Sequence, residues 1–392
     1  FSRNSLGFDL VIQQISLLVF PLTNSPVSRV EMASPPVATQ ATSSGASAQA
    51  AAAPTTVAEE TTADGDTHIA ALEAEAIDDD DGDSALGITD DQLSSESLRS
   101  SIYHYHMENG RKYHSLSQGK YILPNDEEEN DRLDIQNHHF RITFDGRQYF
   151  APGADSAKRV LDVGTGTGIW AIEFADDHPD ATVIGVDLSP IQPEFVPPNC
   201  QFEVDDLEKE WTWTKPFDYI FSRMMIMSFA SWDNYLVQVD RHLVPGGWIE
   251  MIDIYFPGGS DDGTLTEDLN LFKWNEYMRK ASVELGRDWM EVQNHKKRLV
   301  DFGYQNVQQK NFKWPINTWP KDKKHKEVGL WTLANIEAGL EGLCMALFTR
   351  GLGWTQEEVV SFVAAVRKEM RDPRIHAYWQ IVVIYGQKPF DK

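Results

Sequence analysis

The sequence predicts an α/β fold built on a doubly wound, mostly parallel β-sheet. Residues 159–187 carry the first observation, an apolar run that passes into a glycine-rich loop, a helical segment and a second apolar run ending on Asp187. Apolar runs without alternation are typical of parallel strands that are buried on both faces. The second observation is that further apolar runs alternate with connecting segments as far as residue 254, as in repeated strand–helix–strand units.

The individual elements follow from the spacing of apolar residues and from turn signals. Core strands are expected at residues 160–163, 181–186, 200–204, 217–222 and 248–254, with helices at 169–177 and 232–243. Further helices are expected at 265–285, 289–302, 323–349 and 355–371, and two last strands at 303–312 and 376–388. The sheet therefore has seven strands, and a helical insertion separates the last two along the chain.

The residues before the core are expected to fold as N-terminal helices. Leu93–Met107 has helical periodicity and ends before Asn109 and Gly110, residues 111–123 are loop-like, and Asn125 caps a helix with an acidic first turn. The predicted division is a tail at 1–90, a helical lid at 91–150, a cofactor-binding core at 151–256, and a helical cap with the last two strands at 257–392.

The formal net charge of −25 is concentrated near the N-terminal end. Residues 32–98 contain fourteen Asp or Glu and no Lys or Arg, and much of this segment is Ala, Ser, Thr or Pro. Such a segment cannot bury enough apolar surface to offset its ordering entropy, so we expect residues 1–90 to be disordered. The acidic balance also argues against direct binding of DNA or RNA, which needs a basic surface.

Residues 1–31 precede the first methionine, Met32. Their apolar patch at residues 15–20 is too short to span a bilayer and follows no basic region. We therefore expect no membrane contact, and we expect translation to start at Met32. A signal peptide or membrane anchor is the alternative. The two cysteines, Cys200 and Cys344, exclude a disulfide scaffold and lack metal-ligand spacing, so no metal is expected. They fit a reducing intracellular compartment.

The glycine-rich loop indicates a bound nucleoside. Gly164, Gly166 and Gly168 allow the backbone to turn into the helix and to approach a ligand with no Cβ in between. Asp187 falls at the tip of the second strand, where a carboxylate can accept hydrogen bonds from both ribose hydroxyls. An adenosine-containing ligand is therefore expected.

The spacing of the glycines distinguishes between such ligands. The dinucleotide fingerprint is G-x-G-x-x-G, whereas this loop reads G-x-G-x-G, with Asp162 before it and Asp205 and Asp206 after the third strand. A pyrophosphate gains little from these carboxylates, whereas a sulfonium cation tolerates them. The three segments resemble motifs I to III of class I S-adenosylmethionine (SAM) methyltransferases, which have a Rossmann-like fold. A glycine turn in another kind of α/β domain is the alternative.

A closer resemblance covers about residues 95–390. The segments ENGRKYH, YILPND, DVGTGTGIWAI, DLSPIQP, FEVDDLE, PFDYIFSR, PGGWIE and SDDGT occur in this order, and in them the chain is similar to the fungal LaeA-like methyltransferases. The resemblance implies a SAM-dependent methyltransferase that acts in or regulates fungal secondary metabolism and development, in the cytoplasm or nucleus. It also implies velvet-type regulatory proteins as partners, and a small molecule or a protein as the methyl acceptor.

The resemblance also implies which residues contact SAM. Those expected at its methionine and adenosine parts are Asp162, Gly164, Thr165, Gly166 and Gly168. Asp187 is expected to hold the ribose, with Leu188 under the adenine. Asp205 or Asp206 is expected to accept from the adenine amino group, and Leu207 to give a backbone contact. Ser222 and Arg223 are expected where substrate and cofactor meet.

Two further residues are expected to close the pocket from the N-terminal side. They are Tyr121 and Arg132, the latter pairing with the methionine carboxylate. Alternatives stay open: Arg132 pairs with Glu128 one turn away on its own helix, Tyr121 only packs, and Asp205 and Asp206 are only turn residues.

No catalytic residue follows from the sequence. Methyl transfer from a sulfonium is an in-line displacement, and a base is needed only if the acceptor must lose a proton. The candidates for such a base are His104, His106, His114, His138, His139 and Asp253. The alternative function is a regulatory binding protein that assembles with velvet-type transcriptional regulators and transfers little or no methyl.

Overall fold

The computed structural model describes residues 106–114 and 122–391. The predicted tail at residues 1–90 lies outside the described residues, as does the predicted helix at 93–107 apart from its last two residues. Those two residues, His106 and Met107, belong to a strand instead.

A seven-stranded, mostly parallel sheet is the centre of the described chain, as predicted. Its strands are β3 (Arg159–Val163), β4 (Thr182–Asp187), β5 (Cys200–Val204), β6 (Phe217–Arg223), β7 (Leu243–Ser260), β8 (Gln305–Pro315) and β9 (Ala377–Gln387). Their order is β5-β4-β3-β6-β7-β9-β8. The first five are parallel, and β9 is antiparallel to both of its neighbours. The chain leaves β3 toward β4 on one side and later returns to β6 on the other, so a crevice opens at the carboxyl end of β3.

Helices cover both faces of the sheet because successive strand residues point to opposite faces. Val160 of β3 belongs to the apolar core shared with α4 (Ile169–Asp177), whereas the adjacent Leu161 belongs to the core shared with α5 (Trp232–His242) and α7 (His295–Asp301). Both side chains are fully buried. The sheet is therefore doubly wound, as the unalternating apolar runs predict.

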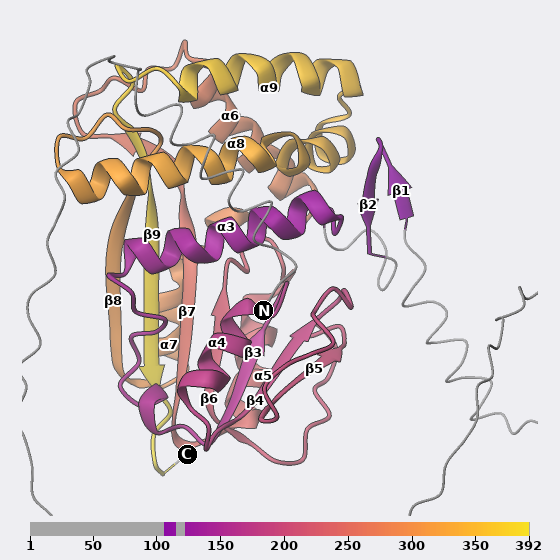
Figure 1. Cartoon of the computed structure of the whole chain (residues 1–392), viewed down its shortest axis with the longest axis vertical. Helices are drawn as coiled ribbons and strands as arrows, with labels where there is room; N and C mark the ends of the chain where they lie inside the picture. Colours follow the sequence, from indigo (N-terminus) through magenta and orange to yellow (C-terminus); the bar gives the residue numbers. More distant parts are fainter. Residues whose placement is uncertain (1–105, 115–121, 392) are drawn as a thin grey trace, which may run out of the picture. The chain divides into compact units, whose positions relative to one another are not determined.

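Four longer helices lie near the carboxyl ends of the parallel strands. They are α3 (Glu127–Thr143), α6 (Asn270–Glu284), α8 (Lys323–Leu352) and α9 (Gln356–Met370). Figure 1 shows α3, α8 and α9 stacked beside the end of the sheet at which β7 ends and β9 begins. The insertion between β8 and β9 supplies α8 and α9, so the predicted helical insertion is confirmed.

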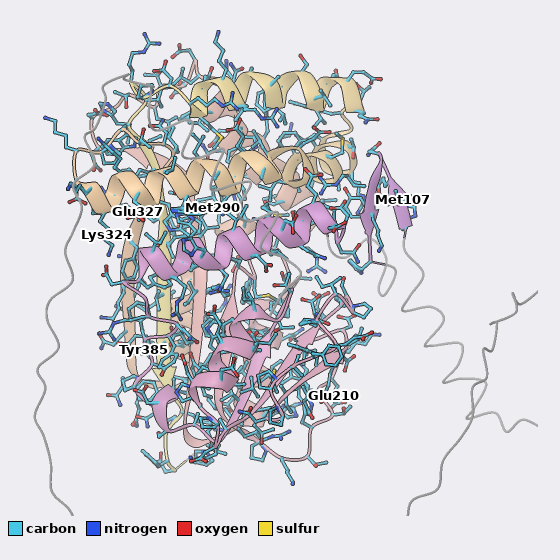
Figure 2. The ribbon with its side chains drawn as sticks, in the orientation of Figure 1. Met107, Glu210, Met290, Lys324, Glu327 and Tyr385 are labelled. Atoms are coloured by element: carbon cyan, nitrogen blue, oxygen red, sulfur yellow. The ribbon has the colours of Figure 1, made fainter. Side chains whose placement is uncertain are left out.

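Polar contacts join the N-terminal helix and its following loop to the rest. The carboxylate of Glu250 on β7 is fully buried and accepts from the backbone N–H groups of Phe150 and Ala151, at 2.9 and 2.7 Å. Lys324, labelled at the beginning of α8 in Figure 2, forms an ion pair of 2.6 Å with Asp145 in the turn after α3. These contacts attach the chain that follows α3 to β7 and to the beginning of α8.

A short hairpin precedes α3 where the sequence analysis placed the end of a helix and a loop. Its strands are β1 (His106–Glu108) and β2 (Arg111–Tyr113), joined by Asn109 and Gly110 with φ angles of 49° and 78°. Two consecutive residues with positive φ are typical of a tight two-residue hairpin turn. Asn109 and Gly110 therefore form a hairpin turn rather than a helix end. The N-cap of α3 is Asp126, not Asn125, and its side chain accepts from the N–H of Glu129.

Candidate functional site

One pocket opens at the carboxyl ends of β3, β4, β5 and β6, in the crevice of the sheet. Its empty volume is about 1040 Å³, including the space open to solvent. Ten of the predicted cofactor residues line it: Asp162, Gly164, Thr165, Gly166, Asp187, Leu188, Asp205, Asp206, Leu207 and Arg223. Helix α3 forms another wall through Leu133 and Gln136. The residues that the sequence analysis assembled from four strand ends therefore lie around one cavity.

The glycine loop requires residues without a side chain. Gly164 has a φ of +70°, and a Cβ there would lie 2.2 Å from Sδ of Met225. Gly166 has a φ of +57°, and its backbone N–H donates to Oδ2 of Asp187 at 2.9 Å. The loop is thus held in a left-handed conformation and joined to the end of the next strand.

Asp162 is the buried acid at the end of β3. It is 3% exposed, and its Oδ2 accepts a hydrogen bond of 2.6 Å from the hydroxyl of Thr165. Burial raises the pKa of Asp162 to about 7, while the Thr165 hydrogen bond and the charge of Arg223 act in the opposite direction. A cationic ligand group in the pocket would favour the carboxylate form.

Asp187 ends β4 and uses both carboxylate oxygens locally. Oδ2 accepts from the N–H of Gly166, and Oδ1 accepts from the N–H of Ser189 at 3.0 Å. Burial raises the pKa of Asp187, and these backbone donors oppose that shift. Each carboxylate oxygen has a second lone pair, so Asp187 can hold the loop and still accept from two ligand hydroxyls.

Asp205 and Asp206 act as turn residues and also line the pocket. Oδ1 of Asp205 accepts from the N–H of Asp206 at 2.7 Å, and Oδ1 of Asp206 accepts from the N–H of Glu208 at 3.1 Å. The two interpretations of this acidic pair therefore do not exclude each other. The turn places Leu207 and Glu208 on the same wall.

Arg223 is the cation of the pocket. It ends β6, its guanidinium donates to Oδ1 of Asn137 on α3 at 2.9 Å, and it lies 4.8 Å from the centre of the Phe140 ring. Desolvation lowers the pKa of Arg223 to about 10, partly offset by the charge of Asp162, so Arg223 remains charged at neutral pH. Within the described residues no carboxylate comes within ion-pair distance of Arg223.

Arg132 does not line this pocket, which corrects its expected position. It is 4% exposed, and its guanidinium donates to both oxygens of Glu129 at 2.9 and 2.7 Å and to Oδ1 of Asn335 on α8 at 2.8 Å. The local ion pair proposed as the alternative exists, but its partner is Glu129 rather than Glu128. The side chain of Arg132 thus lies between α3 and α8, where it packs against Gly339.

Two other predicted residues are near the pocket but do not line it. Ser222 is 1% exposed within β6, between β3 and β7. Gly168 is the N-cap of α4, and a Cβ there would lie 2.3 Å from the ring of Phe202. Tyr121 lies outside the described residues.

Several lining residues were missed by the sequence analysis as cofactor contacts. They are Leu133, Gln136, Glu208, Met224, Met225, Ser228 and Phe229. Leu133 and Gln136 are three residues apart and so share a face of α3. Helical phase relative to the pocket is set by how α3 packs, so this face could not be chosen from the sequence. Met224 and Met225 directly follow Arg223, so their position after a strand end was a usable signal.

None of the described candidates for a general base lines the pocket. His139 is fully buried, stacks on Trp314 at 3.8 Å, and has its pKa lowered to about 3 by desolvation. Asp253 is 1% exposed and accepts from the N–H of Ile226 at 3.0 Å, so it holds the loop after β6. His106, His114 and His138 are not among the lining residues, and His104 lies outside the described residues. Within the described part, no group of three His, Cys, Asp or Glu could hold a metal ion.

Comparisons with known proteins identify the family of the chain. A profile of the Methyltransferase domain family matches residues 135–309. Methyltransferase pytC of Aspergillus terreus is 39% identical over 302 residues, which are 77% of this chain and 93% of pytC. Secondary metabolism regulator LAE1 of Cochliobolus heterostrophus is 38% identical, over 72% of this chain and 95% of that protein. Protein-methionine methyltransferase laeA of Emericella nidulans is 35% identical, over 73% of this chain and 77% of that protein.

The parallel sheet, the glycine loop after β3 and the acid at the end of β4 define a class I SAM-dependent methyltransferase. Because these relatives are 35–39% identical over more than two thirds of its length, the chain belongs to the LaeA-like methyltransferases of fungi. No helix in residues 106–114 and 122–391 is both long and apolar enough to cross a membrane.

Proposed function

We propose that the pocket binds SAM with its adenosine toward β4 and β5 and its methionine part toward β3 and β6. Asp187 accepts from the ribose hydroxyls, Leu188 and Leu207 contact the adenine, and Asp205 or Asp206 accepts from its amino group. Asp162, Gly164, Thr165 and Gly166 surround the methionine part. What supports this arrangement is that all these residues line one cavity at the carboxyl end of a parallel sheet.

Arg223, rather than Arg132, takes the carboxylate of the methionine part. Arg223 lines the pocket and is charged at neutral pH, whereas the guanidinium of Arg132 is already bound by Glu129 and Asn335. Asp162 stands near Arg223 and matches the amino group of the same part of SAM. The carboxylate of the methionine part then faces Arg223 at the end of β6, and its amino group faces Asp162 at the end of β3.

The acceptor that this site fits best is a neutral nucleophile that keeps its protons, such as the thioether of a protein methionine. Among the residues that the structure describes, the titratable groups lining the pocket are five carboxyl groups and Arg223, with no His or Lys. A thioether attacks the sulfonium methyl group through its lone pair, becomes a sulfonium itself and releases S-adenosylhomocysteine, with no proton to remove. The name of the Emericella nidulans relative favours this acceptor class, and Met224, Met225 and Phe229 give it apolar walls.

A regulatory role in fungal secondary metabolism, in the nucleus or cytoplasm, is the setting that we propose for this activity. Two relatives are named as regulators of secondary metabolism or as methyltransferases of proteins. Velvet-type regulators are the proposed partners, either as methyl acceptors or in an assembly that needs no methyl transfer. A pull-down with the folded part that recovers velvet-type regulators but leaves them unmethylated favours assembly alone.

Calorimetric titration of the protein with SAM and with NAD, beside an Asp187→Ala variant, tests the cofactor site. We expect micromolar binding of SAM, no response to NAD, and a loss of at least tenfold in SAM affinity in the variant. Mass spectrometry after incubation with methyl-labelled SAM and candidate proteins then tests the acceptor. Label found on oxygen or nitrogen of a small molecule, and none on methionine, would refute the acceptor class.

A further inference from the structure

A partly buried ion pair next to the pocket joins two of its walls. Arg287 follows α6 and is 8% exposed, and its Nη2 and Nη1 donate to the two carboxylate oxygens of Glu208 at 2.8 and 3.2 Å. We propose that the Arg287–Glu208 pair sets the separation of the two loops that form the wall of the SAM site, which makes Arg287 a positioning residue for the cofactor. This inference rests on the proposed cofactor site.

The Glu208 end of the pair belongs to the loop after β5. Glu208 itself lines the pocket, two residues beyond Asp206, and its N–H donates to Asp206. Its Oε1 also accepts from the N–H of Ala230 at 2.7 Å. The carboxylate of Glu208 thus joins its own loop, after β5, to the loop after β6 and to Arg287.

The Arg287 end reaches the loop after β6 directly. Nη1 donates to the carbonyl oxygen of Ser228 at 2.5 Å and lies 3.4 Å from that of Met227. Ser228 lines the pocket, whereas Arg287 does not. Met227 has a φ of +65°, a conformation that a residue with a side chain adopts only when its surroundings enforce it. Arg287 therefore stabilises an otherwise unfavourable loop conformation from outside the pocket.

Arg287 is itself held on both sides along the chain. Its N–H donates to the carbonyl oxygen of Ser282 at 2.9 Å, after Gly286 has turned the chain with a φ of +70°. Two residues later, Trp289 stacks on Phe256 of β7 with ring centres 4.1 Å apart. The guanidinium therefore has a fixed position relative to the sheet, and a displacement of α6 would move the loops that it binds.

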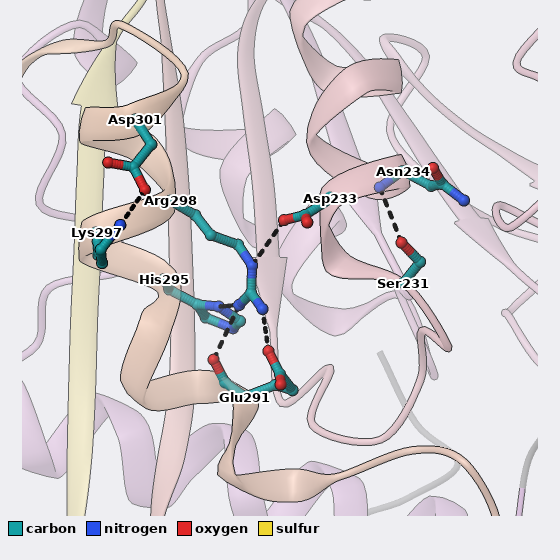
Figure 3. Close-up of polar contacts among 8 residues, drawn as sticks. All are labelled: Ser231, Asp233, Asn234, Glu291, His295, Lys297, Arg298 and Asp301. Atoms are coloured by element: carbon teal, nitrogen blue, oxygen red, sulfur yellow. Dashed lines mark hydrogen bonds and ion pairs between the residues drawn. The ribbon is translucent and has the colours of Figure 1, made fainter.

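The alternative explanation is that Arg287 only strengthens the attachment of the helical cap. The chain contains a suitable control in Arg298 of α7, which Figure 3 shows between Asp233 of α5 and Glu291. Arg298 donates to Asp233 at 2.9 Å and to the carbonyl oxygen and carboxylate of Glu291. Like Arg287, it joins the segment after β7 to the core, but neither Arg298 nor its two acids line the SAM pocket.

The experiment compares Arg287→Gln, Arg287→Lys and Arg298→Gln in the full chain by SAM calorimetry, with thermal unfolding of the unliganded protein. We expect Arg287→Gln to raise the Kd for SAM at least tenfold and Arg298→Gln to change it less than twofold, even where both lower Tm. Arg287→Lys keeps the charge but cannot bind both oxygens of Glu208, so its Kd is expected to lie between wild type and Arg287→Gln.

The pairing itself is tested in a Glu208→Gln background, where Arg287→Gln should change the Kd less than threefold further. Wild-type affinity in Arg287→Gln, or an equal loss in Arg287→Gln and Arg298→Gln, would overturn the inference and leave the SAM site intact. Absence of SAM binding by the wild-type protein would instead overturn the site assignment, and this inference with it.

Discussion

The hydroxyl of Thr165 donates a hydrogen bond of 2.6 Å to the buried carboxylate of Asp162, from the glycine loop back to the end of β3. Because burial raises the pKa of Asp162 to about 7, a fraction of the unliganded protein carries a protonated Asp162 at neutral pH. The amino group and sulfonium of SAM favour the ionised form. In the proposed binding mode, proton release from Asp162 is therefore coupled to cofactor binding.

This coupling predicts a pH-dependent affinity. Below about pH 7, the Kd for SAM should rise by up to about tenfold per pH unit, because binding then requires Asp162 to lose its proton. Asp162→Asn should bind more weakly at pH 8 and show little change down to pH 6. Thr165→Val removes a hydrogen bond that lowers the pKa of Asp162, so the break in its pH profile should move upward. Calorimetry from pH 5.5 to 8.5 measures the pH dependence of the Kd in all three proteins. The same slope below pH 7 in the wild type and in Asp162→Asn would contradict the coupling.

Gly164→Ala should abolish SAM binding. The added Cβ would lie 2.2 Å from Sδ of Met225, and an L-residue at a φ of +70° costs about 1–2 kcal/mol. We expect at least a hundredfold rise in the Kd for SAM. Gly263→Ala is the matched control, because Gly263 has a φ of +74° and nothing lies within 4 Å of the added Cβ. Both variants should lower Tm, Gly164→Ala by more, and only Gly164→Ala should lose SAM binding; equal affinities would argue against the loop as cofactor site.

Arg223→Gln and Arg132→Gln should have opposite effects on binding and stability. Arg223 lines the pocket, so its replacement should weaken SAM binding about tenfold or more with a small change in Tm. Arg132→Gln leaves the carboxylate of Glu129, 5% exposed, without its ion-pair partner and should cost about 3–5 kcal/mol of folding free energy. Its Kd should stay within threefold of wild type. The reverse result would restore Arg132 as the residue that binds the methionine carboxylate.

Asp253→Asn should keep methyl transfer within a few-fold of wild type, because Asp253 holds the backbone N–H of Ile226 and does not line the pocket. Burial raises the pKa of Asp253 to about 8, far above its usual value of 3.8. Its protonated form is favoured by the fold, so this contribution to stability is fully present below about pH 4 and is lost as the pH rises through 8.

The asparagine variant should therefore lose less stability between pH 4 and pH 8 than the wild type, by up to about 1.4 kcal/mol per pH unit. Urea unfolding across this range measures the difference. A collapse of turnover in Asp253→Asn with normal SAM affinity would instead identify Asp253 as a base.

Much of this fold could be predicted because its strands are buried on both faces. Short apolar runs such as 160–163 and 217–222 are typical of such strands, and the glycine loop marks where the first helix of the core begins. The hairpin at Asn109–Gly110 carried the usual signal of a two-residue turn, but strands of three residues are too short to show an alternating pattern. It was therefore mistaken for the end of a helix.

The site was predicted where residues lie at strand ends and missed where they lie on α3. A strand end faces the crevice whatever packs around it, so Asp187 and Arg223 could be placed from sequence. The face of α3 that meets the pocket depends on how α3 packs against α8, which directs Arg132 toward Asn335 and leaves Leu133 for the cofactor side. Contacts between residues 203 positions apart are not visible in local periodicity.

The position of β9 between β7 and β8 constrains the order in which the protein can fold during synthesis. Among the described strands, β8 pairs only with β9, yet residues 305–315 are synthesised before α8, α9 and β9. Until the strand at 377–387 is made, β8 lacks its native partner, and the edge of β7 to which β9 will bind is unpaired. The nascent chain therefore carries two strands whose shared partner is made last, and both are open to non-native strand pairing until then.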